Sequence, residues 1–543
     1  MVAVKDRLHG FGCIGLLVLI ACTLCLDLFH GLSLGQDRIG YHPLYRFRQS
    51  LAVAISRLHD PPAGAYLAYG SVLNVLTENG FAIFDGEPGQ QLDPRGWEAL
   101  LDDGPRLDRM IREAKDVAID PGAPPEIIRA NELGLADYMY FSFRLFGDKI
   151  SSFYYFFFFL VAVSCLFYVL QFRDSPFLLF LLVIFLGELY FLENYACSYG
   201  VELNTVSNSR LFSGLSLVPA LHVLLLLWQR RPPGAFTLAA VIVQSAIFAF
   251  LLSCRTELAW QAAMIAAVAC GIALSVLPRR KDRKRRRLID RLSPLWPAAI
   301  FLAVVSTYSA AVSLRADQRY AMEPKAHIVW HEFMIGLLGS SMELRREYLG
   351  DAPPGGDDSE VYTAVIRDLN ARNDSSAPIV RRLGDGQLTI DLMRGWAEYD
   401  RLVRSLVLRI IRDHPLAVLE TAPAKVREQI AWYDNPVRHS MGWSNLLVPI
   451  ILIAAGALIC MAAGGLTIGA AMAGSAAGAI AIVLLFAAVT PMIEPSGMSI
   501  GTLFSYLGVV AILVPYAAML LIRAIAGVKS KAKGVSFGAE SLR

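Results

Sequence analysis

Long apolar runs alternate with charged stretches along this chain, and this alternation sets the expected architecture. Ten windows are predicted as membrane spans, and several exceed the roughly 18 uncharged residues that a helix needs to cross a bilayer. They lie at 11–28, 153–170, 177–192, 211–228, 235–253, 258–277, 295–314, 446–463, 468–490 and 502–522. The pattern predicts an all-α polytopic membrane protein with about ten transmembrane helices.

Two long stretches of mixed charge separate the apolar blocks and predict α-rich extracytoplasmic domains. The expected division is a first transmembrane helix (1–34), a first extracytoplasmic domain (35–150), a six-helix block (151–314), a second extracytoplasmic domain (315–440), a three-helix block (441–523) and a cytoplasmic tail (524–543). Within the domains, residues 49–58, 65–77, 92–115 and 391–414 are predicted to be helical, the first two because their apolar residues recur at a spacing of three to four.

A basic loop gives the predicted orientation. Pro278–Arg291 reads PRRKDRKRRRLIDR, with nine Lys or Arg between two apolar runs. In a soluble protein such a run could bind nucleic acid. Between membrane-length segments it indicates a cytoplasmic loop instead, so no nucleic-acid partner is expected. Ten spans then place both termini in the cytoplasm and both large loops outside the inner membrane.

Composition agrees with this interpretation. The chain has 543 residues, of which 55% are hydrophobic, and that share excludes an ordinary soluble protein. The formal net charge of +3 comes from uneven patches and says little about partners. The first apolar run could also be a cleaved signal peptide, since Leu19–Cys22 resembles a lipoprotein cleavage site. A retained first span is preferred because nine further spans follow.

Few polar groups interrupt the spans. Glu188, His222 and Gln244 stand out, and an ionisable residue at membrane depth is by default a functional candidate. For Glu188 the alternative is a hydrated interfacial carboxylate, and for His222 it is a satisfied buried histidine. A transporter should carry polar residues deep in several spans. Most of these spans lack such residues, which favours chemistry or binding at the outer surface.

Two segments carry a resemblance to a known family. Gly134–Asp148 is an aromatic-rich segment that ends in Leu-Phe-Gly just before a span, and the stretch between Tyr399 and Trp432 has a helix, His-Pro, helix pattern before the late spans. Both resemble segments of the GT-C superfamily of polytopic membrane glycosyltransferases. The resemblance implies transfer of a sugar from a polyprenyl-phosphate-linked donor to a cell-envelope acceptor outside the membrane.

The resemblance also implies an acidic residue in the first outer loop that acts as base or in a metal-linked role. A carboxylate can take the proton of the acceptor hydroxyl as the glycosidic bond forms. By position the catalytic candidates are Asp37, then Asp137 and Glu193. The chain departs from the family pattern, which has an Asp-Glu or Glu-Asp pair after span one. The alternative for Asp37 is a solvated loop charge.

The tight turn between spans five and six offers a site for the lipid phosphate. Arg255 and Glu257 lie in this turn, and an arginine fork suits phosphate oxygens. The alternative is that both residues are charged because the tip of a hairpin is exposed to solvent, or that they pair with each other.

One pair of histidines has metal-ligand spacing. His327 and His331 would share one face of a helix at the i, i+4 spacing that can hold zinc. Structural or acceptor-contacting histidines are the preferred interpretation, and a divalent metal is the alternative. The runner-up function for the whole chain is a non-catalytic or transport protein that handles envelope lipids or polysaccharide.

Overall fold

The computed structural model of the chain is mostly helical. The structure describes residues 2–35, 44–59, 67–69, 104–116, 125–127, 133–198, 211–229, 232–255, 258–276, 293–315, 329–350, 358–391, 396–421, 423–424 and 443–463.

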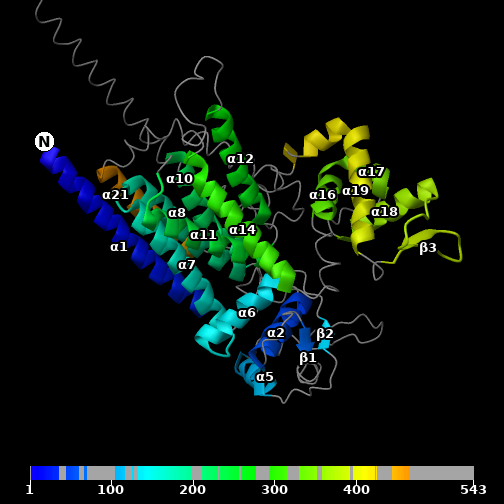
Figure 1. The fold of residues 1–543 in the computed structure, drawn as a ribbon, viewed down its shortest axis with the longest axis horizontal. Coiled ribbons are helices and arrows are strands. Elements are labelled where there is room, and N and C mark those ends of the chain that lie inside the picture. Colours follow the sequence, from blue (N-terminus) through cyan, green and yellow to red (C-terminus); the bar gives the residue numbers. More distant parts are fainter. Residues whose placement is uncertain are drawn as a thin grey trace, which may run out of the picture.

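The apolar segments form one bundle of helices (Figure 1). Its members are α1 (Val2–Gly35), α7 (Ser151–Phe172), α8 (Pro176–Ser198), α9 (Leu211–Leu215), α10 (Leu217–Gln229), α11 (Ala235–Cys254), α12 (Ala259–Val276), the 3-10 turn η2 (Ser293–Leu295), α14 (Trp296–Arg315) and α21 (Trp443–Ala462). Eight of the predicted spans coincide with these helices. The fourth is divided at Ser216 into α9 and α10, and the windows 468–490 and 502–522 lie outside the described residues.

Length and composition single out the helices that can cross a membrane. Within the described ranges, four helices meet both criteria: Arg7–Gly31, Ser151–Phe172, Ala235–Cys254 and Ser293–Arg315. Pro176–Tyr190, Leu217–Leu227, Gln261–Leu274 and Leu447–Ala462 are apolar but shorter. These helices are compatible with a membrane protein, and the total of ten spans stays a prediction.

Three chain segments meet where α1 begins. The His9 ring lies 3.3 Å from the Ala463 carbonyl oxygen and 3.2 Å from that of Asp174, in the turn between α7 and α8. The start of α1, the α7–α8 turn and the end of α21 therefore share one end of the bundle, here called the His9 end. Further along, His30 of α1 stacks on Tyr190 of α8 at 4.4 Å between ring centroids, so these two helices run parallel.

Small residues let α21 pack closely against its neighbours. A Cβ added at Gly12 of α1 would lie 2.3 Å from the Ala463 Cβ, and one at Gly456 of α21 would lie 3.0 Å from a methyl group of Val183 on α8. Gly187 of α8 faces the same helix. In lipid the hydrophobic effect does not drive helices together, and glycines let their backbones approach closely. α21 therefore fills a groove between α1 and α8.

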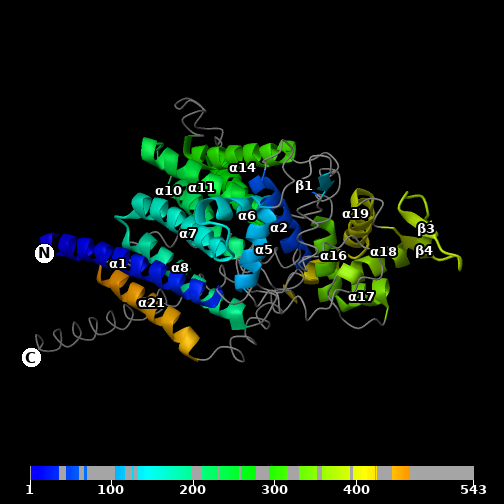
Figure 2. The same cartoon turned by 90° about the horizontal axis from the view of Figure 1, so that it is seen from below.

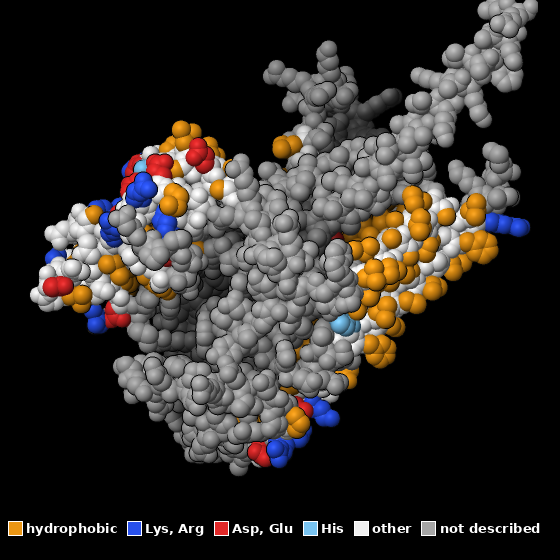
Figure 3. Space-filling model, turned by 180° about the vertical axis from the view of Figure 1, so that it is seen from behind, with side chains coloured by type: hydrophobic (Ala, Val, Ile, Leu, Met, Phe, Trp, Pro, Cys, Tyr) orange, Lys and Arg blue, Asp and Glu red, His pale blue; other side chains and the backbone are white. Residues whose placement is uncertain are grey.

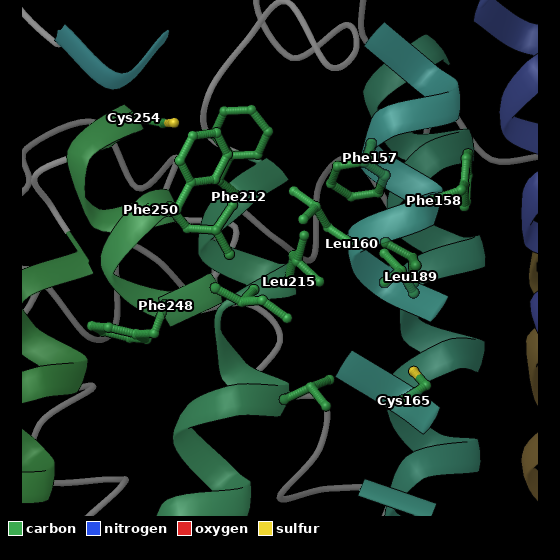
Figure 4. Close-up of a cluster of buried hydrophobic side chains, with 14 of the residues drawn as sticks. Phe157, Phe158, Leu160, Cys165, Leu189, Phe212, Leu215, Phe248, Phe250 and Cys254 are labelled. Carbon is green, nitrogen blue, oxygen red and sulfur yellow. The ribbon is translucent and has the colours of Figure 1, made fainter. Parts of the chain in front are cut away.

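Aromatic side chains fill the bundle core. Figure 4 shows Phe157 of α7, Phe212 of α9 and Phe250 of α11 gathered between their helices. Tyr138 lies among the same rings, 4.8 Å from Phe212 between centroids, and its hydroxyl donates to the Phe153 carbonyl. The core thus holds the start of α7 against α6, α9 and α11.

Hydrophobic side chains also cover an outer flank of the bundle (Figure 3). Along α1, Phe11, Ile14, Val18 and Phe29 expose more than half of their surface. An exposed apolar surface of this extent marks contact with a partner or a membrane, and on a helix that can span a bilayer lipid is the natural contact.

The chain between α1 and α7 forms a small helical layer at the opposite end of the bundle, here called the α6 end. It contains α2 (Leu44–His59), β1 (Leu67–Tyr69), α5 (Gly104–Asp116), β2 (Pro125–Ile127) and α6 (Leu133–Phe146). Gly147 ends α6 with a φ of +92°, a conformation that suits glycine. The backbone N–H of Ile150 donates to Asp108 of α5 at 2.9 Å, so α5 helps to fix the turn into α7.

Of the three helices predicted in this layer, one is confirmed, one is confirmed in part and one is wrong in part. α2 matches the predicted helix at 49–58, and α5 matches the second half of 92–115, whose first half lies outside the described residues. The helix expected at 65–77 is contradicted at Leu67–Tyr69, which pairs as an antiparallel strand with Pro125–Ile127. The strand partner is almost sixty positions away, so a local apolar spacing could not reveal it.

The chain between α14 and α21 forms a second unit, residues 329–424, here called the α16–α19 unit (Figure 2). It contains α16 (Val329–Ser340), α17 (Met342–Leu349), α18 (Asp358–Arg372), β3 (Val380–Arg382), β4 (Leu388–Ile390) and α19 (Trp396–Asp413). It has its own hydrophobic core and a buried Arg345–Glu360 pair joined at 2.6 and 3.1 Å. The helix predicted at 391–414 is confirmed over Trp396–Asp413, and residues 392–395 lie outside the described residues.

Candidate functional site

A buried acidic residue lies on α6, close to the end of α11. Gly134 packs so closely on α11 that an added Cβ would lie 2.1 Å from the Ser253 Oγ and 2.6 Å from the Cys254 backbone nitrogen. Asp137 lies three residues further along α6, on nearly the same face of the helix, and is completely buried. The small residue therefore brings the acidic side chain of α6 against the end of α11.

Two arginines from different helices meet the Asp137 carboxylate. The Arg57 guanidinium of α2 donates to Asp137 Oδ1, and Arg315 at the end of α14 lies 3.5 Å from the same oxygen. The Arg57 guanidinium also lies over the Tyr140 ring, 4.3 Å from its centroid. Opposite charge and the aromatic face both stabilise a buried guanidinium, so the acid fixes Arg57 in place.

The two arginines differ in their access to solvent. The Arg57 side chain is 7% exposed, whereas that of Arg315 is 45% exposed. Two guanidinium groups against one carboxylate leave a formal excess of one positive charge among these three residues. Because Arg315 is the accessible member, this excess can be presented to an anion at the edge of the bundle.

The end of α11 belongs to the same cluster. Tyr308 of α14 hydrogen-bonds Ser253 and lies within electrostatic range of Asp137, Cys254 and Arg315. Arg255 is the residue after Cys254. Its backbone N–H donates to the Leu251 carbonyl at 2.9 Å, and its φ and ψ angles are extended. The predicted catalytic residue Asp137 and the predicted phosphate ligand Arg255 thus lie at the same end of the bundle. We call Arg57, Asp137, Tyr308 and Arg315 the α6-end cluster, and Arg255 is the residue that follows Cys254 beside it in the chain.

Three other predicted site residues cannot be placed in this cluster. Asp37 and Glu257 lie outside the described residues. Glu193 belongs to the last turns of α8, where the structure does not describe side chains. Their predicted catalytic and phosphate-binding roles stay predictions.

The predicted metal pair is described for one member only. His327 lies outside the described residues, whereas His331 is buried in the α16–α19 unit. The His331 Nδ1 lies 2.9 Å from the Tyr399 hydroxyl, and its ring packs on Tyr362 and Tyr399. Over the described ranges, the structure brings no three His, Cys, Asp or Glu side chains together as a metal site. His331 therefore has a contact that a structural histidine would make.

The polar residues at membrane depth have separate surroundings. Gln244 donates to the Ser164 carbonyl at 2.8 Å and lies 3.1 Å from His222 Nδ1, so one ring nitrogen of this buried histidine has a polar contact. By contrast, both carboxylate oxygens of Asp27 and one oxygen of Glu188 lack a hydrogen-bond partner among the described residues, although both side chains are buried.

Sequence reasoning missed three members of the α6-end cluster. Arg57 is a single charge in an otherwise apolar helical face, and Arg315 is the first charge after a span. Both signals also fit a snorkelling or interfacial arginine. Tyr308 gave no signal, because tyrosine is common near the ends of spans. Only the packing of α2, α6, α11 and α14 brings these side chains together.

The cluster can hold an anionic group, but it contains no carboxylate that is ready to act as a base. The Asp137 carboxylate is already engaged by two arginines, and a base must reach the proton that it removes. No known protein family model matches this chain, and no curated protein sequence shows a significant match to it.

Proposed function

We propose that the protein transfers a sugar from a polyprenyl-phosphate-linked donor to a cell-envelope acceptor at the outer face of the inner membrane. The observation that carries this proposal is the α6-end cluster. A buried acid there fixes one arginine and leaves a second, Arg315, half exposed at the end of a helix that can span the bilayer. That is where the phosphate of a lipid-linked donor would lie.

In this proposal the α6-end cluster binds the phosphate of the donor, and a carboxylate of the first outer loop acts as the base. Arg315, together with Arg255 in the adjacent turn, holds the phosphate of the donor, and Asp137 positions the arginines. Asp37 takes the proton of the acceptor hydroxyl while the acceptor oxygen bonds to the sugar carbon. The bond from that carbon to the phosphate oxygen breaks, and the lipid phosphate leaves with the electron pair. Glu193 is the second candidate for the base, and Glu257 accompanies Arg255.

The proposal is supported by agreement between position and chemistry. Arginine forks bind phosphate oxygens through paired charge-assisted hydrogen bonds. The two chain segments that resemble GT-C enzymes include α6, which supplies Asp137 and Tyr140. Both termini in the cytoplasm and both large loops outside is the orientation that the proposal requires.

The test is sugar transfer by the full-length protein in lipid vesicles with radiolabelled polyprenyl-phosphate sugars and an envelope extract. Arg315→Gln should raise the KM for the donor by about tenfold or more, since hydrogen bonds to charged groups contribute roughly 1.5–3 kcal/mol. Asp37→Asn should lower kcat and leave donor binding intact. Repeating the assay with a chelator tests the predicted divalent metal at His327 and His331.

A matched control is Arg372→Gln on α18, because Arg372 is also about two-fifths exposed and pairs with an acid, Asp368, far from the cluster in sequence. It should change neither KM nor kcat. Absence of transfer by the wild type with every donor and acceptor would overturn the proposal, and an equal effect of Arg315→Gln and Arg372→Gln would remove the cluster from it.

A second candidate function is movement of an envelope lipid or polysaccharide across the membrane. The observation in its favour is the buried Asp27 carboxylate, which has no hydrogen-bond partner in the described part of the chain, since intramembrane acids often serve transport pathways. Vesicles that contain the protein and a fluorescent lipid-linked saccharide distinguish the two functions. Transport moves the intact molecule between leaflets, whereas transfer releases its sugar to an acceptor.

A further inference from the structure

The last helical segment of the α16–α19 unit exposes apolar side chains that its core does not use. Helical hydrogen bonding continues past Asp413, because His414 N donates to the Ile410 carbonyl at 2.8 Å and Val418 N to the His414 carbonyl at 3.1 Å. Residues 415–421 are helical as well. Pro415 therefore falls inside a nearly continuous helical path rather than ending it.

One face of this path is core and another is exposed. Tyr399, Val403, Val407 and Ile410 are fully buried in the unit. Four other apolar residues remain outside: Leu408 is 47% exposed, Ile411 37%, Leu416 73% and Leu419 69%.

The exposed residues share a face. At about 100° per residue, spacings of three, five and three keep all four within an arc of roughly 140°. Arg404 and Arg412 are exposed within the same arc. We call Arg404, Leu408, Ile411, Arg412, Leu416 and Leu419 the α19 stripe. Apolar residues flanked by arginines along one helical face are typical of a helix that lies in the interface of a bilayer.

Both arginines of this face already have a contact within the protein. Arg412 hydrogen-bonds Asp413, and the Arg404 guanidinium lies 5.6 Å from the centroid of the Trp330 ring. Attraction to anionic lipid is therefore not the main argument. Burial of the leucine side chains in lipid supplies the favourable free energy, and the arginines can keep their charged ends in the headgroup layer.

The chain ties the unit to the membrane at both ends. Thirteen residues separate Arg315 at the end of α14 from Val329, and eighteen separate Ala424 from Trp443 of α21. At no more than about 3.6 Å per residue, the first connection reaches roughly 50 Å. A tethered surface meets the bilayer at high effective concentration, so a small apolar face is enough to hold it there.

The placement of the unit agrees with this. Figures 1 and 2 both show the gold chain that follows α19 on the side of the unit nearer to the membrane helices. Both also show the β3–β4 hairpin at the far side. The chain that follows α19 thus leads toward the bundle, and the hairpin leads away from it.

We propose that the α19 stripe lies in the interface of the bilayer beside the α6 end of the bundle, with Leu416 and Leu419 among the lipid chains. The lipid surface is the occupant, and it holds the α16–α19 unit in one orientation over the membrane. This inference does not depend on the proposed transferase activity.

The test uses full-length protein in membranes of defined phospholipid that carries a radiolabel. A photo-crosslinking amino acid replaces Leu416 or Leu419 in two variants, and Leu383 beside β3 in the control. Leu383 is a matched control because it is 49% exposed but lies beside the hairpin. After illumination, Leu416 and Leu419 variants should carry at least fivefold more labelled lipid than the Leu383 variant.

Equal lipid labelling at all three positions would overturn the inference. A product in which Leu416 joins another segment of the chain or a second copy would also overturn it, because the stripe would then have a protein occupant. A further variant keeps the result interpretable: Leu419→Asp in the Leu416 background should reduce lipid labelling, whereas Asp385→Asn in that background should not.

Discussion

The Arg57–Asp137 pair shows how one buried interaction organises four helices. Asp137 of α6 meets Arg57 of α2 and Arg315 of α14, and Tyr308 links the same group to the end of α11. A buried ion pair adds little net stability, but removing one partner leaves a buried charge uncompensated. The position of Arg315 at the edge of the bundle therefore depends on an acid that solvent does not reach.

A double-mutant cycle tests this dependence. Asp137→Leu should lower stability by about 3–5 kcal/mol, because it strands the Arg57 guanidinium. Arg57→Met combined with Asp137→Leu should recover most of this loss. The readout is the Tm of purified protein in detergent at one scan rate, since unfolding of large membrane proteins is often irreversible. Strictly additive losses in the double variant would contradict the pairing.

At Asp400 of α19 the structure predicts a dependence on pH. Burial raises the pKa of this carboxyl, while the charges of Arg404 and His331 act in the opposite direction. One of its oxygens is buried and has no hydrogen-bond partner among the residues that the structure describes. The folded state then holds the proton more tightly than the unfolded state. The stability from this group is present below the ordinary carboxyl pKa of about 4 and is lost as the pH rises through the raised pKa.

Replacement by asparagine isolates this effect. Asp400→Asn should gain stability relative to wild type between pH 4 and pH 7, with a Tm difference of a few degrees at most. The same comparison for Asp385→Asn, in the exposed turn after β3, should show no such trend. A difference between wild type and Asp400→Asn that shrinks as the pH rises would contradict the assignment.

At the scale of elements, the sequence predicted the periodic features and missed the pairings. The helices α2, α7, α11, α14 and α19 follow from apolar spacing or length, and the break between α6 and α7 follows from Gly147. The β1–β2 pairing was missed because it joins distant segments. The approach of Arg57 and Arg315 to Asp137 was missed because it depends on which helices pack together, and apolar patterns do not encode that choice.

Gly134 provides a test of how α6 docks on α11. Gly134→Ala should lower stability by roughly 1–3 kcal/mol or more, because the added methyl group would overlap the Ser253 backbone carbon at 2.4 Å. It should also shift α6 and weaken the contact of Arg315 with Asp137. The matched control is Gly271→Ala in α12, where nothing lies within 4 Å of the added carbon. That change should be neutral or stabilising by up to about 1 kcal/mol. Equal Tm values for the two variants would contradict the close approach.

At the scale of the molecule, the ends of the helices fit an alternating path through a membrane. α1 and α8 run in one direction, α21 ends where α1 begins, and the α7–α8 turn joins them at the His9 end. The α6-end cluster gathers the ends of α11 and α14 on the opposite side. The predicted basic loop at 278–291 lies outside the described residues, so the side that each end faces stays a prediction.

Reporter fusions decide the orientation. Fusions at Asp174 in the α7–α8 turn and at Arg285 should both report the cytoplasm, because the basic loop sets that side. A fusion at Asp357, before α18, should report the opposite side. If Arg285 and Asp357 report the same side, the proposed outer location of the α6-end cluster is wrong.

The glycine contacts of α21 have a consequence for biosynthesis. This helix fills the groove between α1 and α8, yet about 240 residues separate the end of α8 from its start. At roughly 5–20 residues per second, the ribosome needs tens of seconds to supply it. During that time the groove must be occupied by lipid or by an insertion factor. A chain truncated before Trp443 should therefore be captured by membrane chaperones or degraded, even though most of its helices have already been made.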